Sequence, residues 1–304
     1  LDGNLDEIRI SSAARSADWL TTEFNNQNNP GAGGFLKTVG AQETDPIGWW
    51  RLDESSGTTA FDNGGSNDGN YNNDVALNQD GACDSTNSAI YFDGDADGDE
   101  DYIQISHDPA YLLDEGSISL WFRADQVGGS IGLFSKDEPG GGTGGHLTIS
   151  VEGTEVRFRL QDSSNNSYIA QGGTIVENTW YHVVATWGSA GMKLYIDGVQ
   201  VDTDPYTGGT TSGTGNSLPI YLGAHNMLAG GLTGFLMGYM DDVQIYDRAI
   251  DITEAQALAG CAPGDKTAPS AVTDLATGAV AADSIELTWT AVGDDSSAGT
   301  ASSY

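Results

Sequence analysis

The chain has 304 residues, of which 44 are acidic and 11 are basic, giving a formal net charge of −33. This balance argues against nucleic-acid and anionic-membrane partners, because binding to phosphate depends on lysine and arginine. No apolar run reaches the roughly 18 residues that a membrane-spanning helix needs, so we expect no membrane insertion. The acidic excess has two readings: solubility in saline water, or binding of divalent cations through oxygen ligands.

The beginning of the chain repeats a pattern found near residue 240. Residues 3–10 (GNLDEIRI) and 238–245 (GYMDDVQI) both alternate apolar and polar positions and carry two adjacent carboxylates. Such a distant repeat predicts tandem modules. We therefore expect residues 1–24 to be the C-terminal remnant of a preceding module, and residues 25–45 to be a polar linker.

Strand signals then follow one another at short intervals from Ile47 to Tyr246. Alternating apolar residues separated by turn residues predict about a dozen strands and almost no helix. Asp197-Gly198 is a dipeptide that tight type I′ hairpins prefer. The sequence thus predicts an all-β chain, with a two-sheet jelly roll at residues 46–262.

The composition changes again at residues 263–269, which we expect to be a hinge. Two further strand signals follow within residues 270–304. We expect this last segment to be a truncated domain, with Trp289 in its core.

Several segments resemble, in order, a bacterial laminin-G-like module of the concanavalin A-like lectin/glucanase superfamily. They are GWWRLDESSGTTAFDNGG, SAIYFDG, DYIQI, SISLWFRA, TWYHVVATW, MKLYIDGVQV and GYMDDVQIYDRAI. Residues 265–291 are similar to the opening of a fibronectin type III domain, which is an Ig-like sandwich. The resemblance implies a secreted or cell-surface multidomain bacterial protein, but it implies no particular ligand, because this fold carries many functions.

The two cysteines, Cys83 and Cys261, lie far apart in the sequence. They are either two unrelated buried thiols or one disulfide that ties an early segment to the exit of the last strand. For an exported chain we expect the disulfide.

Residues 93–101 (DGDADGDED) are the densest acidic run. Alternating carboxylates with glycine are typical of a calcium loop, although Gln104 stands where an EF-hand has glutamate and a strand signal follows instead of a helix. The alternative is a solvated acidic hairpin tip. The predicted Ca²⁺ ligands are Asp93, Asp95, Asp97 and Asp99.

The superfamily resemblance implies a second, structural calcium where the loop after the first strand meets the final strand. The matching positions are Asp62 and Asp241, with Asn67 nearby. Asp6 repeats the acidic position in the first copy of the repeated pattern. The alternative is that Asp241 merely caps a turn.

The sequence does not predict an enzyme. Glucanase relatives place three acids on one strand to supply nucleophile and acid/base, and no such run is present. The histidines show no metal-type pairing, and no serine lies in a nucleophile elbow. His182 is expected to be a strand residue whose ring is hydrogen-bonded.

Aromatic and polar residues in the long loops are the predicted sugar contacts. Trp49 and Trp50 are adjacent and must face opposite sides of their strand. Most of the other strand aromatics are expected in the core, and the alternation lets at most about half of them face outward: Trp121, Phe122, Trp180, Trp187, Tyr195 and Tyr221. The predicted ligand-binding residues are His146, Tyr168, Tyr206, His225 and Asn226.

These observations predict a calcium-stabilised, non-catalytic module for carbohydrate recognition or adhesion. Its expected partners are a glycan or another ligand of the extracellular matrix or cell surface, and neighbouring modules of the same polypeptide. Two alternatives stay open: a structural spacer in a long surface or filament protein, and an ancillary binding module of a polysaccharide-degrading enzyme.

Overall fold

The computed structural model describes residues 46–82, 88–94, 99–137, 146–210, 216–226 and 231–260, together with the strands at 276–280 and 285–288. The chain divides into two units, residues 45–267 and residues 1–44 with 268–304. The expected complete module falls within the first unit. Outside the described residues lie the expected remnant at residues 1–24, both linkers and Trp289. Cys83 and Cys261 also lie outside them, so the disulfide stays a prediction.

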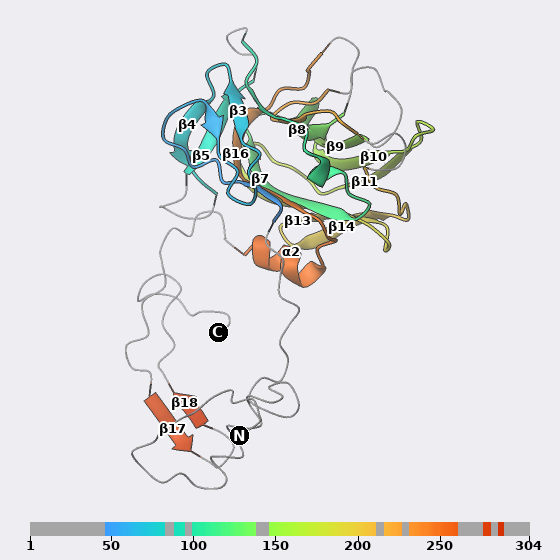
Figure 1. The fold of residues 1–304 in the computed structure, drawn as a ribbon. Coiled ribbons are helices and arrows are strands. Elements are labelled where there is room, and N and C mark those ends of the chain that lie inside the picture. The colour runs from blue at the N-terminus through green and yellow to red at the C-terminus, as the bar shows by residue number, and fades with distance from the viewer. Residues whose placement is uncertain are drawn as a thin grey trace, which may run out of the picture. The chain divides into compact units, whose positions relative to one another are not determined.

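Two antiparallel sheets form a sandwich in the first unit (Figure 1). Sheet A has the order β14-β13-β12-β7-β16-β5-β4, and β1 also pairs with β16. Its strands are β1 (Gly48–Trp50), β4 (Ala76–Asp80), β5 (Ser88–Asp93), β7 (Gly116–Ala124), β12 (Trp180–Trp187), β13 (Met192–Ile196), β14 (Val199–Asp204) and β16 (Met237–Tyr246).

Sheet B has the order β11-β10-β9-β8-β15-β6-β3-β2. Its strands are β2 (Thr59–Ala60), β3 (Gly69–Asn72), β6 (Tyr102–Ile105), β8 (Ser130–Lys136), β9 (His146–Glu152), β10 (Glu155–Gln161), β11 (Ser167–Gly172) and β15 (Ile220–Leu222). A short 3-10 helix, η1 (Pro109–Tyr111), precedes β7. The all-β jelly roll predicted from the alternation of apolar residues is confirmed.

The core lies between the two sheets and takes every second residue of the central strands. In β7, for example, Ile118, Leu120 and Phe122 are buried in the main apolar cluster, so Ser119, Trp121 and Arg123 must point to the other face. Trp50 is fully buried and Trp49 is only half-buried, as expected for adjacent strand residues. Trp187 and Phe122 also lie in the core as predicted.

The predicted hairpin between β13 and β14 is present. Asp197 and Gly198 have φ values of 50° and 71°, the left-handed conformation that a type I′ turn requires at both central residues. The Asp197 carboxylate also accepts the backbone N–H of His182 at 2.8 Å. This turn therefore fixes the hairpin against the neighbouring strand β12.

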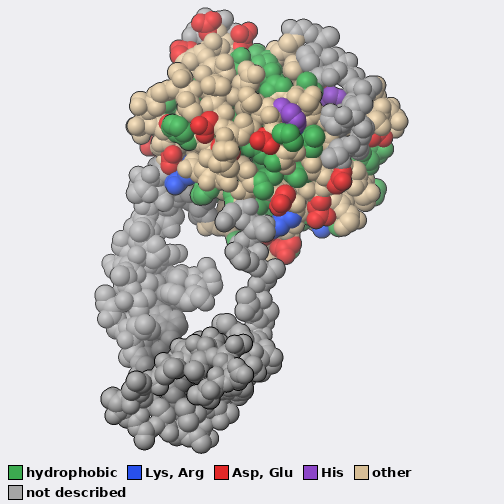
Figure 2. Space-filling model, in the orientation of Figure 1, with side chains coloured by type: hydrophobic (Ala, Val, Ile, Leu, Met, Phe, Trp, Pro, Cys, Tyr) green, Lys and Arg blue, Asp and Glu red, His purple; other side chains and the backbone are tan. Residues whose placement is uncertain are grey.

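In the second unit, β17 (Ala276–Val280) and β18 (Ile285–Thr288) pair in antiparallel fashion, which agrees with the two strands expected there. No helix among the described residues is long and apolar enough to cross a membrane. On the face shown in Figure 2, Asp and Glu side chains are spread widely, while Lys and Arg appear at only a few points.

Candidate ligand-binding site

The helix α2 (Ile252–Leu258) covers part of the outer face of sheet A, the face turned away from the core. It begins after Asp251, whose carboxylate accepts the Glu254 N–H at 3.0 Å, a favourable N-cap. Beneath it lies a second apolar cluster formed by Val184, Tyr195, Tyr246, Ile250 and Ala255.

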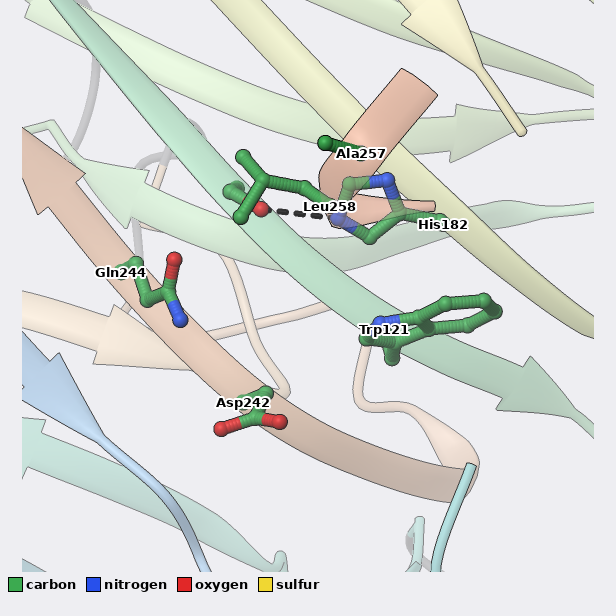
Figure 3. Close-up of a pocket in the computed structure, with 7 residues that line it drawn as sticks. Trp121, His182, Asp242, Gln244, Ala257 and Leu258 are labelled. Atoms are coloured by element: carbon green, nitrogen blue, oxygen red, sulfur yellow. Dashed lines mark hydrogen bonds between the residues drawn. The ribbon is translucent and has the colours of Figure 1, made fainter. Parts of the chain in front are cut away.

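An open groove lies beside the C-terminal end of α2 (Figure 3). Its volume is about 240 Å³, somewhat below that of pockets for drug-sized ligands, roughly 300–1,000 Å³. Side chains from β7, β12 and β16 form its floor and α2 forms one wall. The lining residues are Ser119, Trp121, His182, Asp242, Gln244, Ala257 and Leu258.

His182 and Ser119 form a buried polar pair in the groove. The His182 Nε2 atom lies 2.8 Å from Ser119 Oγ, as the dashed line in Figure 3 marks. Burial lowers the pKa of His182 to about 3, so the ring is neutral at physiological pH. Its Nδ1 atom has no hydrogen-bond partner within the described part of the chain, so the ring is only half satisfied, in contrast to the expectation.

Asp242 reaches the groove because the register of β16 shifts between Asp241 and Gln244. Asp242 has φ 46°, an uncommon conformation for a residue other than glycine. Such irregularities in a strand re-aim side chains. The Asp242 carboxylate accepts the indole N–H of Trp49 at 2.8 Å, which helps to hold its position.

Asp241 lies directly opposite Trp121 in the pairing of β16 with β7. Its side chain is fully buried and accepts the Ala82 N–H at 2.8 Å. Burial, followed by the adjacent Asp242 carboxylate, raises the pKa of Asp241 to about 8. The two neighbouring aspartates are therefore unequal, and Asp242 is the one that lines the groove.

The groove combines an aromatic ring with a few convergent polar groups. Trp121 is 3% exposed and supplies a small part of its indole. Asp242 supplies an acceptor, and Gln244 an amide that both donates and accepts. Neutral His182 adds a dipole but no charge. This set suits a neutral, hydroxyl-rich ligand with an apolar face.

Three of the predicted ligand-binding residues lie elsewhere, with the polar groups of sheet B. His146, His225 and Asn226 are 2%, 2% and 8% exposed. His146 Nδ1 lies 2.8 Å from the carboxylate of Asp137, which also pairs with Arg159 at 2.7 Å. Burial works to raise the pKa of Asp137, but the His146 contact and Arg159 outweigh it and lower that pKa.

Near the same residues, the His225 ring nitrogens lie 3.0 Å from Ser130 Oγ and 3.2 Å from Thr233 Oγ1. Asn226 donates to the backbone oxygen of Asp137 at 3.4 Å. These side chains are thus engaged inside the protein, and their role in ligand binding stays a prediction.

The other two predicted contacts, Tyr168 and Tyr206, stack on each other. Their ring centroids are 3.6 Å apart and the planes differ by 5°. The Tyr168 hydroxyl donates to Asp162 at 3.0 Å. The faces that stack are closed to a ligand, so any sugar contact would use the outer faces or edges.

Asp62, Asn67 and Asp241, the predicted structural calcium ligands, all have protein partners. The Asp62 carboxylate accepts four backbone N–H groups, those of Trp49, Gly64, Gly65 and Asn67, at 2.9–3.0 Å. The Asn67 amide donates to the Ser106 backbone oxygen at 2.8 Å. Four N–H donors already contact the Asp62 carboxylate, and the structural calcium at Asp62, Asn67 and Asp241 stays a prediction.

In the acidic segment, Asp93 and Asp99 are described, whereas Asp95 and Asp97 lie outside the described residues. Asp101, which follows them, is 1% exposed and accepts the Asp93 N–H at 3.1 Å through Oδ2. Its Oδ1 atom is buried without a hydrogen-bond partner in the described part. Burial and the Asp93 carboxylate raise the pKa of Asp101 to about 6. Within the described ranges, no group of three or more His, Cys, Asp or Glu could hold a metal ion.

Sequence reasoning missed most of the groove. Trp121 was one of six strand aromatics whose face was not assigned individually, and it lines the groove on the outer face, because the residues on either side of it in β7 point inward. Its place follows from the alternation of the strand, since it lies one position from each of the buried residues Leu120 and Phe122. Asp242 gave no such signal, since its position depends on the register shift.

A family model described as the concanavalin A-like lectin/glucanases superfamily matches residues 96–256. A comparison with curated proteins found no match.

Solved structures with a similar fold include two of the binding domain of botulinum neurotoxin DC. One is in complex with SialylT (16% identity, TM-score 0.56, 74% of this chain and 53% of that chain). The other is in complex with rat synaptotagmin II (15%, TM-score 0.56, 74% and 54%). The receptor-binding domain of botulinum neurotoxin D is also similar (14%, TM-score 0.53, 71% and 52%). The chain spans about half the length of these structures, and at this identity the likeness shows the fold alone.

Proposed function

The chain belongs to the concanavalin A-like lectin/glucanases superfamily, and from that premise we propose that it is a non-catalytic module that binds carbohydrate in the groove beside α2. The observation that carries the proposal is the groove itself. An indole, a carboxylate and an amide converge on a space suited to a sugar ring, and each comes from a strand of the rigid sheet. Concave sites with an apolar wall and a few placed polar groups are typical of small-ligand binding.

The chemistry of the groove supports binding rather than hydrolysis. Glycoside hydrolysis needs two carboxyl groups placed on either side of the scissile bond. Asp241 and Asp242 are adjacent in the chain, and Asp241 is fully buried. Neutral His182 has its Nε2 engaged with Ser119 and a very low pKa, which makes it a poor proton carrier near pH 7.

Domains of the same fold bind both glycan-type and protein ligands. One similar structure is a complex with SialylT and another a complex with synaptotagmin II. A protein ligand is therefore the second candidate for this chain. The proposal extends to a secreted or cell-surface location and a role in adhesion. It is also compatible with an ancillary module of a polysaccharide-degrading enzyme.

Calcium is part of the proposal as a stabilising ion at the acidic segment. Its support is Asp101, whose buried carboxylate leaves one oxygen without a hydrogen-bond partner next to the Asp93 backbone. A desolvated carboxylate near other carboxylates is stabilised by a cation or by a proton. The proposed ligands are those predicted from the sequence, Asp93, Asp95, Asp97 and Asp99, with Asp101 added; of these, Asp95 and Asp97 lie outside the described residues.

A glycan array probed with the full chain, in calcium and in EGTA, tests the proposal. We expect binding to a defined set of glycans, with weaker signals in EGTA if calcium stabilises the fold. Uniformly negative binding by protein shown to be folded would reject the carbohydrate role and favour the structural spacer or a protein ligand.

A further inference from the structure

A row of four side chains crosses the outer face of sheet A next to the groove. Trp180, Arg123, Tyr239 and Tyr91 are consecutive cross-strand partners on β12, β7, β16 and β5. All four are half-buried, so each keeps part of its surface in solvent. We call these four residues the aromatic row.

The rings of the aromatic row pack against one another. The centroids of Tyr91 and Tyr239 are 4.7 Å apart, and those of Trp180 and Tyr239 are 6.1 Å apart. The guanidinium carbon of Arg123 lies 3.8 Å from the centroid of Tyr239 and 5.9 Å from that of Trp180. The arginine is thus held between two rings, which fixes its direction.

Arg123 differs from the other arginines that the structure describes. Arg51, Arg157, Arg159 and Arg248 each pair with a carboxylate within 4.0 Å. Arg123 has no such partner in the described part of the chain, and its buried Nε atom has no hydrogen-bond partner there. In a protein of net charge −33, where carboxylates are abundant, an arginine without an ion pair is unexpected.

Stacking on the rings does not provide hydrogen-bond acceptors for the N–H groups of Arg123. A guanidinium has five N–H donors in a planar fork that fits a carboxylate with two parallel hydrogen bonds. Contacts with aromatic faces use the charge but none of these donors. The aromatic row therefore offers apolar ring surfaces, with planes tilted by 57° and 60°, beside an oriented arginine that has no ion pair in the described part of the chain.

We propose that the aromatic row binds a sugar bearing a carboxylate, with its ring on the Trp180 and Tyr239 side chains and its carboxylate on Arg123. This inference rests on the proposed function and names the ligand class. Trp121 and His182 in the groove lie two residues from Arg123 and Trp180 on the same strands, roughly 7 Å away. The groove and the aromatic row then form one surface for an oligosaccharide with an acidic unit at the row.

The overall charge restricts this ligand to one with isolated acidic groups. Charges farther apart than about 8 Å are largely screened at physiological salt. A single carboxylate at Arg123 therefore escapes the repulsion from distant carboxylates, and meets only those near the aromatic row, Asp125 and Asp93, which both act on Tyr91. A polyanion would also meet the distant ones.

The test compares acidic glycans with their carboxyl-reduced forms, which keep the ring and lose the charge. Uronic-acid and sialic-acid oligosaccharides and the reduced counterparts are titrated into the full chain by calorimetry at physiological salt. We expect about tenfold tighter binding of at least one acidic form, since hydrogen bonds to a charged group are among the stronger ones. Arg123→Gln should abolish the preference, and Arg123→Lys should keep only part of it.

Arg157→Gln is the matched control, because Arg157 lies on sheet B and is paired with Glu152. Equal melting temperatures of the variants exclude loss of fold as the cause. If neutral glycans bind but no acidic form is preferred, or if Arg123→Gln keeps the preference, the inference is wrong while the proposed function stands. If neither acidic nor neutral glycans bind, both are rejected.

Discussion

His182 is a titratable residue that folding places where it cannot carry a charge. Its ring is buried between Ser119 and Trp121, 4.9 Å from the indole centroid. An unfolded chain takes up a proton at this histidine near pH 6.5, whereas the folded chain does so only near pH 3. The contribution of the neutral, buried ring to the free energy of unfolding is therefore complete above pH 6.5, and it is lost as the pH falls from 6.5 towards 3.

We predict that His182→Gln flattens this pH dependence. Between pH 6.5 and 4.5 the free energy of unfolding of the wild type should fall, relative to the variant, by about 1.4 kcal/mol for each pH unit. Urea unfolding of both proteins at several pH values measures this difference. Parallel curves for the two proteins would show that the ring is protonated in the folded state.

Asp101 offers a second residue-scale prediction, because a cation and a proton have opposite consequences there. If calcium binds between Asp93 and Asp101, adding calcium at pH 7.5 should raise the melting temperature of the wild type by several degrees. Asp101→Asn should remove that increase, and Asp247→Asn, at an exposed position, should not.

Without a bound cation, the raised pKa of Asp101, about 6, has the opposite effect on stability. The free energy of unfolding then falls as the pH rises from about 4 to 6, and it stays lower above pH 6. Asp101→Asn would then stabilise the protein at pH 7.5, and calcium would have no effect on the melt of the wild type. That pair of observations would reject the calcium proposal.

At the scale of elements, the β13–β14 hairpin and α2 are packed together, and the groove depends on both. A Cβ added to Gly198 would lie 2.9 Å from the Gln256 backbone in α2, and the position has φ 71°. Gly153, in the β9–β10 hairpin, has a similar φ of 66° but has nothing within 4 Å. The two glycines therefore separate the cost of the conformation from the cost of the contact.

We predict that Gly198→Ala destabilises the protein more than Gly153→Ala. Both changes should cost roughly 1–2 kcal/mol for the left-handed conformation, and Gly198→Ala should cost more because α2 must shift. Chemical unfolding of the two variants measures the difference, and ligand binding should weaken only in Gly198→Ala. Equal losses of stability would mean that α2 does not rest on this turn.

The elements also show how far sequence reasoning reaches. Strands such as β7 and β12 could be predicted because their alternation and the burial of one face obey the same period of two. The position of Asp242 could not, because it depends on an irregular register that no local pattern encodes. His146 and His225 looked like loop-edge sugar contacts, but tertiary packing buries both rings against polar neighbours.

At the scale of the whole molecule, the fold and the net charge together indicate which surface a ligand would contact. The sandwich has two outer faces, one on each sheet, and the side chains described on them differ. The outer face of sheet A carries the groove and the aromatic row. The polar cluster around Asp137 on sheet B satisfies its own charges with His146 and Arg159. The acidic surface disfavours polyanions, so the outer face of sheet A is the surface we expect a glycan to contact.

The most direct measurement is the affinity of the folded chain for its strongest array glycan before and after changes in the groove. Asp242→Ala and Gln244→Ala remove the two polar groups that a sugar would contact, while Asp247→Ala and Gln200→Ala change exposed residues of the same types away from the groove. We predict at least a tenfold loss of affinity for each groove variant, from one or two lost hydrogen bonds to the ligand, and none for the controls. Groove variants that melt normally and bind as tightly as the wild type would contradict the account.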